Sequence, residues 1–200
     1  MEFQKFRVPL ELESELHTFY SEQAVFALSE LEQVRTELSK LFGVYILFYR
    51  GGFNLYSAIS KANSVKFHRP IYVGKAVAEG ARTGKAIEGA SPRNSLFRRL
   101  REHQTSISAT ENLNSSEFFF RIVAMDAALV DWAESVLINK LKPVWNTRLS
   151  GFGIHDPGKG RYEQARSIWD QLHPGRSWTL KMQNLAAYDL EMLRKSLEEE

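Results

Sequence analysis

The chain has 200 residues and a mass of 23.0 kDa, which is enough for one domain with short extensions. Hydrophobic residues make up 44% and charged residues 25%, an ordinary composition that excludes a disordered or collagen-like chain. The absence of cysteine excludes disulfides, thiolate zinc sites, iron–sulfur clusters and a cysteine nucleophile. The apolar run 44–49 is far shorter than the ~20 residues that cross a bilayer. Residues 1–10 lack the apolar stretch of a signal peptide, so we expect a cytoplasmic protein with no membrane partner.

Charge is distributed unevenly along the chain, although the formal net charge is only +2. Residues 61–103 carry ten Lys and Arg against three Glu, a local charge of +7, and residues 141–185 carry a local charge of +4. The first 42 residues have a charge of −4, and residues 186–200 a charge of −3. A basic face between acidic ends suits a polyanion such as nucleic acid, because binding depends on local phosphate neutralisation. Chance clustering on a solvated surface is an equally good explanation of charge alone.

The amino-terminal half begins with apolar residues at three- and four-residue spacing, which predict an amphipathic helix over 21–41. Residues 43–49 are β-branched and aromatic and precede two glycines, so they predict a short buried strand. Weak helical character follows at 53–59, and a second strand is predicted at 70–74. Residues 75–94 are rich in glycine and alanine with no sustained period, which predicts a loop.

The second half begins with a helix that Ser91-Pro92 introduces and that continues to about 103 or 107. A third strand is predicted at 117–125, where three phenylalanines precede Arg121-Ile122-Val123. Asp126 is expected to cap a helix that runs to 141 and ends before Pro143. The remaining chain is predicted to form a glycine-rich loop and two helices, in order 151–161, 161–172 and 183–198.

This order of elements predicts an α+β fold in which helices pack against a small three-stranded sheet, antiparallel or mixed. The pattern does not by itself distinguish three strands from four. We interpret residues 1–200 as a single domain with a core at about 41–150. Helical extensions flank this core at 1–40 and 151–200, and the second extension is expected to contact DNA.

Two polar residues lie at the edge of an apolar stripe on the helix predicted near residue 100. At 100° per residue, Leu96, Leu100 and Ile107 share one face, and Arg99 and His103 flank it on the same side. The neighbouring charged side chains Arg98, Arg101 and Glu102 point away from this stripe. The pattern therefore identifies Arg99 and His103, four residues apart, as candidate functional residues.

One carboxylate points inward from the next long helix. Glu134 shares a face with Val130, Ala133, Leu137, Ile138 and Leu141. Because an unpaired buried carboxylate is costly, Glu134 should have a cation, a metal ion or strong donors beside it. One explanation is a metal site, since Mg²⁺ needs only one or two protein carboxylates. The other is a buried Glu134–Arg99 ion pair that only organises the core. His155 and Asp156 are expected to be solvated loop residues and are left out of the metal site.

Gly43-Val44-Tyr45 and Tyr72-Val73-Gly74-Lys75 resemble the two short strand motifs of the GIY-YIG nuclease superfamily. The order of the residues that follow resembles the type II restriction endonuclease branch: Arg99 and His103 on one helix, Glu134 on the next, and then Asn146. The loop 151–161 resembles a lineage that cuts CCGCGG-like sites. The resemblance covers about 41–178. It departs from the motifs in having Val44 and Val73 instead of isoleucine, and in an insertion that places the two tyrosines 27 positions apart.

The resemblance implies phosphodiester hydrolysis assisted by one divalent ion, Mg²⁺ or in its place Mn²⁺. In this scheme Glu134 holds the ion, and Arg99 stabilises charge in the transition state. Tyr45 orients or deprotonates the attacking water with help from His103, since a free phenol has a pKa of about 10. Supporting catalytic roles fall to three residues, Tyr72, Lys75 and Asn146.

The implied partner is double-stranded DNA. A palindromic site would be met by a homodimer, because each half-site then contacts an identical surface. A cognate DNA methyltransferase is expected in the same host. The candidate DNA-binding residues are Arg93, Arg98, Lys159 and Arg161. Two other hypotheses remain: a homing or repair nuclease of the same superfamily, and a catalytically silent DNA-binding module.

Overall fold

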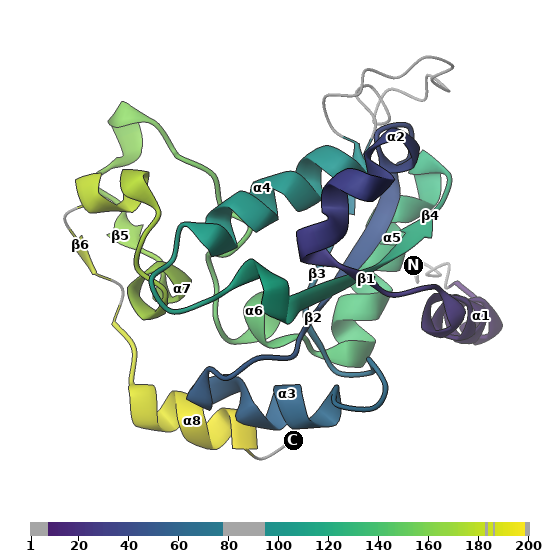
Figure 1. Ribbon diagram of the computed structural model, residues 1–200, viewed down its shortest axis with the longest axis horizontal. Coiled ribbons are helices and arrows are strands. Elements are labelled where there is room, and N and C mark those ends of the chain that lie inside the picture. The colour runs from purple at the N-terminus through teal and green to yellow at the C-terminus, as the bar shows by residue number, and fades with distance from the viewer. Residues whose placement is uncertain (1–7, 78–94, 183, 186, 199–200) are drawn as a thin grey trace, which may run out of the picture.

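The structure is a computed structural model that describes residues 8–77, 95–182, 184–185 and 187–198. Its centre is an antiparallel sheet of four strands, whereas the sequence pattern predicted three (Figure 1). The order across the sheet is β1 (Phe26–Ala27), β4 (Phe118–Ala124), β2 (Gly43–Tyr49) and β3 (Pro70–Ala76). The strand expected at 43–49 is confirmed with the same bounds, and the other two predicted strands agree within two residues at each end.

The core surrounds β2, which pairs with β3 on one side and β4 on the other. All seven of its residues are buried. Tyr45, Leu47 and Tyr49 belong to one hydrophobic cluster, and Val44, Ile46 and Phe48 belong to a second cluster. This alternation is the two-residue period of a strand that is covered on both faces.

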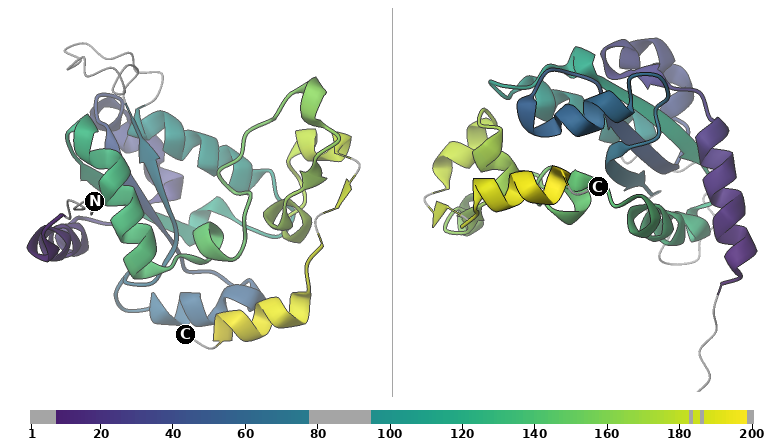
Figure 2. Two further views of the ribbon diagram at one scale, coloured as in Figure 1. Left: turned by 180° about the vertical axis from the view of Figure 1, so that it is seen from behind. Right: turned by 90° about the horizontal axis from the view of Figure 1, so that it is seen from below.

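Helices cover both faces of the sheet (Figure 2). The tyrosine face packs against α4 (Leu96–Ser108) and α6 (Val144–Thr147). The opposite face packs against α1 (Leu10–Glu22) and α5 (Ala127–Leu141). The helix that carries Arg99 and His103, α4, and the helix that carries Glu134, α5, therefore approach the sheet from opposite sides, and both contact β3.

The prediction of one amphipathic helix over 21–41 is wrong. The end of α1, strand β1, a 3₁₀ helix at Leu28–Val34 and the short α2 (Arg35–Leu38) occupy this segment, and α1 itself was not predicted. The apolar spacing is real, because Leu28, Leu31 and Leu38 are buried. Phe26 and Ala27 pair with β4, however, and this tertiary contact interrupts the helix that local spacing favours.

The two central helices are confirmed, but their ends differ from expectation. Ser95 is the N-cap of α4, and its hydroxyl accepts a hydrogen bond from the Arg98 amide. The predicted start at Ser91-Pro92, and most of the predicted loop 75–94, lie outside the described residues. Asp126 occupies the N-cap position of α5 but makes no side-chain cap hydrogen bond. Lys142 adopts a left-handed conformation before Pro143 and ends α5.

The chain after α6 forms a lobe beside α4, at the opposite end of the molecule from α1, except that its last helix, at 190–198, lies apart from this lobe and contacts residues 54–56 (Figure 1). Its helices are shorter than predicted and its two short strands, which pair in parallel, were not predicted. In chain order the described elements are a 3₁₀ helix at Lys159–Arg161, β5 (Ala165–Arg166), α7 (Ile168–Leu172), a 3₁₀ helix at Ser177–Lys181, β6 (Asn184–Leu185) and α8 (Leu190–Glu198).

The insertion between β2 and β3 contains the weak helical segment that was expected. It forms a 3₁₀ helix at Asn54–Tyr56 and α3 (Ser57–Ala62). A further 3₁₀ turn at Ser115–Glu117 precedes β4. Within the described part of the chain, every helix falls short of the length and hydropathy needed to span a bilayer.

Candidate active site

The site centres on a buried hydrogen bond between Tyr45 of β2 and His103 of α4. The Tyr45 hydroxyl oxygen lies 2.5 Å from His103 Nε2, and both side chains are almost fully buried. The ring of Tyr72 in β3 lies 5.2 Å from the His103 ring and 6.3 Å from the Tyr45 ring. Three of the predicted residues, from three elements, therefore converge on one point.

The glycine of the second motif makes this convergence possible. Gly74 lies opposite Tyr45 in the β2–β3 register. A Cβ atom at Gly74 would lie 2.4 Å from the Tyr45 hydroxyl oxygen and 2.8 Å from the Tyr72 ring. A larger residue would therefore displace one of the two phenols. Close packing of the two tyrosine rings thus explains why this position holds a glycine.

Asn146 acts on the outer edge of β3. Its side-chain oxygen accepts from the Val73 amide at 2.8 Å, and its side-chain nitrogen donates to the Val73 carbonyl, also at 2.8 Å. Because β3 is an edge strand, its outward backbone groups lack a neighbouring strand to pair with. The Asn146 amide takes the place of such a strand at Val73. Asn146 thus fixes the strand that carries Tyr72 and Lys75.

Arg99 borders the Tyr45–His103 pair on α4. Its Nη1 donates to Glu102 Oε2 at 2.7 Å and to His155 Nε2 at 2.6 Å. The contact with Glu102 corrects the sequence interpretation, which turned this side chain away from the site. His155 is a loop residue with 59% of its side chain exposed, as expected, but it also contacts Arg99. The three-residue spacing to Glu102 was a usable signal. Nothing local could have identified His155, which lies 56 positions away in a loop.

Glu134 pairs with Lys75 rather than with Arg99. Its Oε2 lies 2.7 Å from Lys75 Nζ, and the same nitrogen lies 2.9 Å from Asp131 Oδ1, one turn earlier on α5. The Glu134 side chain retains 19% exposure, so it is accessible to solvent from one side. The alternative of a Glu134–Arg99 ion pair is therefore wrong. The cation expected beside Glu134 is Lys75 of β3.

Burial determines the protonation of the central pair. It raises the pKa of Tyr45 well above its usual value of 10, and Tyr72 adds to this shift while Arg99 opposes it. Burial also lowers the pKa of His103 well below 6.5, and the charge of Arg99 adds to that shift. Both groups are therefore neutral near pH 7, and they share a hydrogen bond between neutral partners.

The same electrostatics link Glu134 to the tyrosines. Burial raises the pKa of Tyr72; Arg99 opposes this shift and Glu134 adds to it. For Lys75, burial disfavours the charge, but the hydrogen bonds to Glu134 and Asp131 outweigh it and raise the pKa. Lys75 is therefore a cation, and the Glu134 carboxylate acts on the same two phenols as Arg99.

A hard divalent ion fits the donors at Glu134, although it would rely on few protein ligands. Within the residues that the structure describes, no three His, Asp or Glu side chains gather as a metal-binding group. Mg²⁺, however, keeps several waters and is commonly held by one or two carboxylates with substrate phosphate oxygens. The partly exposed Glu134 carboxylate, beside the Tyr45–Tyr72 pair, meets this requirement for one ion.

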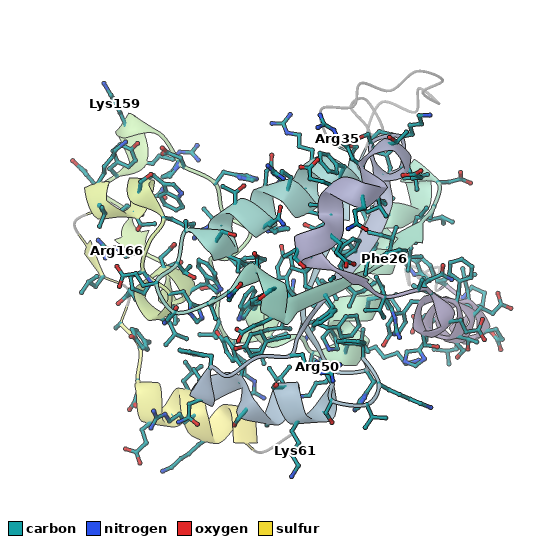
Figure 3. All side chains as sticks on the ribbon, viewed as in Figure 1. Phe26, Arg35, Arg50, Lys61, Lys159 and Arg166 are labelled. Carbon is teal, nitrogen blue, oxygen red and sulfur yellow. The ribbon has the colours of Figure 1, made fainter. Side chains whose placement is uncertain are left out.

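The three candidate DNA-binding residues that the structure describes lie outside this centre. Arg98 is half-exposed on α4 and donates to Glu102 at 3.0 Å. Lys159 and Arg161 are exposed in the C-terminal lobe, and Lys159 points outward from its tip (Figure 3). Arg93 lies outside the described residues.

Acid should destabilise this protein because it buries neutral histidines. Burial lowers the pKa of His173 to about 3, as it lowers that of His103. Below pH 6.5 such a histidine becomes protonated in the unfolded chain but stays neutral in the native state. Each such histidine therefore lowers the free energy of unfolding by about 1.4 kcal/mol for each pH unit that the pH falls. For His173 this continues down to about pH 3. Urea unfolding between pH 7 and 4.5 measures the slope; we expect His173→Gln to reduce it, and a flat profile would contradict the assignment.

A tyrosine pair on a small antiparallel sheet lies beside one helix that carries an arginine and a histidine and near another that carries a glutamate, which is the arrangement that the resemblance to GIY-YIG nucleases implied. The family model described as the Eco29kI GIY-YIG domain matches residues 37–200, and the chain belongs to this family of type II restriction endonucleases. It is therefore a restriction-type nuclease that acts on DNA. A search of the curated proteins found no match.

Proposed function

We propose that this protein is a type II restriction endonuclease that hydrolyses both strands of a short, palindromic, GC-rich DNA site resembling CCGCGG. The observation that carries the proposal is the Tyr45–His103 hydrogen bond, bordered by Arg99 and within electrostatic reach of Glu134. Such a cluster combines a proton acceptor, a cation for transition-state charge and an oxygen ligand for a metal ion. A silent DNA-binding module would need none of these groups in one place.

Tyr45 and His103 activate the water as a relay. A phenol with a raised pKa is a poor base alone, but it can pass its own proton to His103 Nε2 as it takes one from water. This requires the neutral imidazole to carry its proton on Nδ1. The hydroxide then attacks phosphorus, the bond to the leaving oxygen breaks, and this oxygen departs with the bonding electrons and takes a proton from solvent. His103 returns its extra proton to solvent before the next turnover. A buried imidazole whose pKa is lowered stays available as acceptor well below pH 6.5.

The surrounding residues bind and orient. Arg99 neutralises charge on the phosphoryl oxygens in the transition state. Glu134 would hold one Mg²⁺, or Mn²⁺ in its place, which supplies charge stabilisation at the leaving oxygen when bound. Lys75, which pairs with Glu134, and Tyr72 position phosphate and water, while Asn146 fixes β3 beneath them.

Recognition is proposed to use two copies of the chain on DNA, one for each half-site. Base contacts would come from the insertion 50–69, the segment 76–94 and the loop 151–161. Arg93, Arg98, Lys159 and Arg161 would contact the duplex. The cytoplasmic location and the methyltransferase partner stay predictions. A homing or repair nuclease is the second enzyme hypothesis.

Incubation of the purified protein with plasmid and genomic DNA in Mg²⁺ tests the proposal. A site-specific enzyme yields discrete fragments whose sequenced ends share one short palindrome. Scattered cuts or single-strand nicks would favour a homing or repair nuclease, and intact but bound DNA would favour the silent module. EDTA should abolish cutting, and Mn²⁺ should restore it.

Replacement of Arg99 by Ala should suppress turnover more than DNA binding, because its guanidinium borders the buried Tyr45–His103 pair rather than the exposed surface. We expect kcat to fall by about 10²–10³-fold, as for loss of one oxyanion-stabilising donor. Single-turnover cleavage measures the rate, and filter binding in Ca²⁺ measures affinity.

Arg98→Ala is the matched comparison, since Arg98 shares the partner Glu102 but is half-exposed. It should weaken binding and reduce its salt dependence while leaving the single-turnover rate near that of the parent. If the Arg99 variant loses affinity and rate in equal measure, Arg99 is chiefly a phosphate anchor.

A further inference from the structure

Arg176 is the most densely bonded buried cation that none of the steps above uses. It is 4% exposed and lies in the C-terminal lobe after α7. Its Nε donates to Asp170 Oδ1 at 2.6 Å. Its terminal nitrogens donate to three carbonyl oxygens of one loop, those of Gly151 at 3.0 Å, Phe152 at 3.1 Å and Ile154 at 2.9 Å. One guanidinium therefore fixes the backbone of residues 151–154.

The guanidinium is itself held firmly. Trp169 and Trp178 lie against it, with ring centroids 4.7 and 4.8 Å from Cζ. Asp170 is oriented by Ser167, whose hydroxyl lies 2.6 Å from Asp170 Oδ2. A planar fork with five donors suits this arrangement, and a lysine could not reproduce it.

The loop that Arg176 holds forms one wall of the candidate active site. The Phe152 ring stacks on His103 with centroids 4.5 Å apart and an angle of 20°, and it meets the Tyr72 ring edge-on at 4.9 Å. A Cβ atom at Gly153 would lie 2.6 Å from the Tyr72 hydroxyl oxygen. His155, two residues after Gly153, accepts a hydrogen bond from Arg99.

We infer that Arg176 is a positioning residue of this nuclease, which holds the loop 151–155 so that Phe152 packs on His103, Gly153 adjoins Tyr72 and His155 contacts Arg99. The inference rests on the proposed function for its consequence in catalysis. It connects the C-terminal lobe with the hydrolytic centre: the lobe supplies a wall that keeps water away from His103 and limits where Tyr72 can point. This separates Arg176 from a merely structural core residue, because its loss should change the chemistry of His103.

Arg176→Lys tests the inference, because lysine keeps the positive charge but lacks the planar guanidinium whose nitrogens bond Asp170 and the three carbonyl oxygens. NMR titration of the His103 ring is the first readout and needs no cleavage. The charged or titratable groups that face this ring are Tyr45 of β2, Tyr72 of β3, Arg99 of α4, and His155 and Arg176 of the lobe. Since burial is the main cause of the low pKa of His103, a loosened Phe152 should raise that pKa toward 6.5.

The second readout is steady-state cleavage by Arg176→Lys. We expect kcat to fall by about 10²-fold, as for a small misplacement of catalytic groups, while KM stays within about twofold. Thr110→Val is the matched control for lost stability. It removes a buried hydroxyl that donates to the Ile107 carbonyl at 2.8 Å, outside the loop. It should lower Tm but leave kcat and the His103 titration unchanged.

Gly153→Ala decides the matter if the Arg176 variant does not fold. Its added methyl group would displace the Tyr72 hydroxyl, so we expect slower cleavage at an unchanged Tm. A folded Arg176→Lys protein with the parental His103 titration and kcat would overturn the inference, as would a Gly153→Ala protein with the parental kcat. If the parent protein cuts no DNA, the proposed function fails, and the His103 titration in Arg176→Lys still tests the positioning role.

Discussion

Replacement of Glu134 by Gln should abolish DNA cleavage while DNA binding persists. The change keeps the volume of the side chain and removes the negative charge that faces Lys75 and the two phenols. A single-ion site that depends on one inward carboxylate loses several kcal/mol of transition-state stabilisation without it. We therefore expect a single-turnover rate below about one-thousandth of the parent's, since each 1.36 kcal/mol is tenfold. Linearisation of a plasmid that carries one site measures the rate.

Asp131→Asn provides the control for this substitution. Asp131 contacts the same Lys75 nitrogen at 2.9 Å, but its side chain is 70% exposed. The variant removes a comparable ion pair without touching the inward carboxylate, so it should cleave at nearly the parental rate. A Glu134→Gln protein that still cuts would remove Glu134 from the metal-binding role. Equal losses in both variants would instead assign the effect to Lys75.

Tyr45→Phe should slow cleavage by about 10²–10⁴-fold, the usual contribution of general acid–base catalysis. Phenylalanine preserves the packing of the buried ring and removes only the hydroxyl that lies 2.5 Å from His103 Nε2. Without this oxygen, water has no relay to the imidazole. Affinity for DNA should change little, because the hydroxyl is buried in the free protein. Rapid-quench cleavage at saturating enzyme reports the chemical step.

Tyr49→Phe is the matched variant. Tyr49 lies four residues after Tyr45 in β2, so its side chain is on the same face of the sheet. Its hydroxyl accepts from the Phe53 amide at 2.8 Å and bonds Glu117 at 3.1 Å, so its loss should cost about 1 kcal/mol of stability. Cleavage should continue at the parental rate. If Tyr45→Phe also cuts at that rate, the hydroxyl of Tyr45 is structural and the relay is excluded.

Much of the architecture follows from local pattern. The apolar and aromatic run in β2 is long enough to be buried on both faces, and it was predicted with its observed bounds. The helical periods of the segment from Ser91-Pro92 to about 103 or 107 and of the segment from Asp126 to 141 likewise predicted α4 and α5, although α4 begins only after its N-cap Ser95. These elements have strong periods that tertiary contacts reinforce, which is why sequence reasoning succeeded for them.

The prediction failed where a tertiary partner overrode local preference. Spacing alone favours a helix at 21–41, but β1 exists only because Phe26 and Ala27 find an unpaired edge of β4. The lobe after residue 150 has short elements with weak periods, and buried contacts such as Arg176 with Asp170 hold it together. Contacts of this kind leave no periodic signal.

The sequence by itself determined which chemical groups this protein has and which helix or strand carries each of them, because periodicity reports the face on which a side chain lies. It singled out Arg99, His103 and the inward Glu134 in this way. Only the tertiary structure decided the partners: Lys75 for Glu134, Glu102 and His155 for Arg99, and Arg176 for the loop beside them. The physical reason is that charges and hydrogen bonds pair by distance in space, and the fold alone sets those distances.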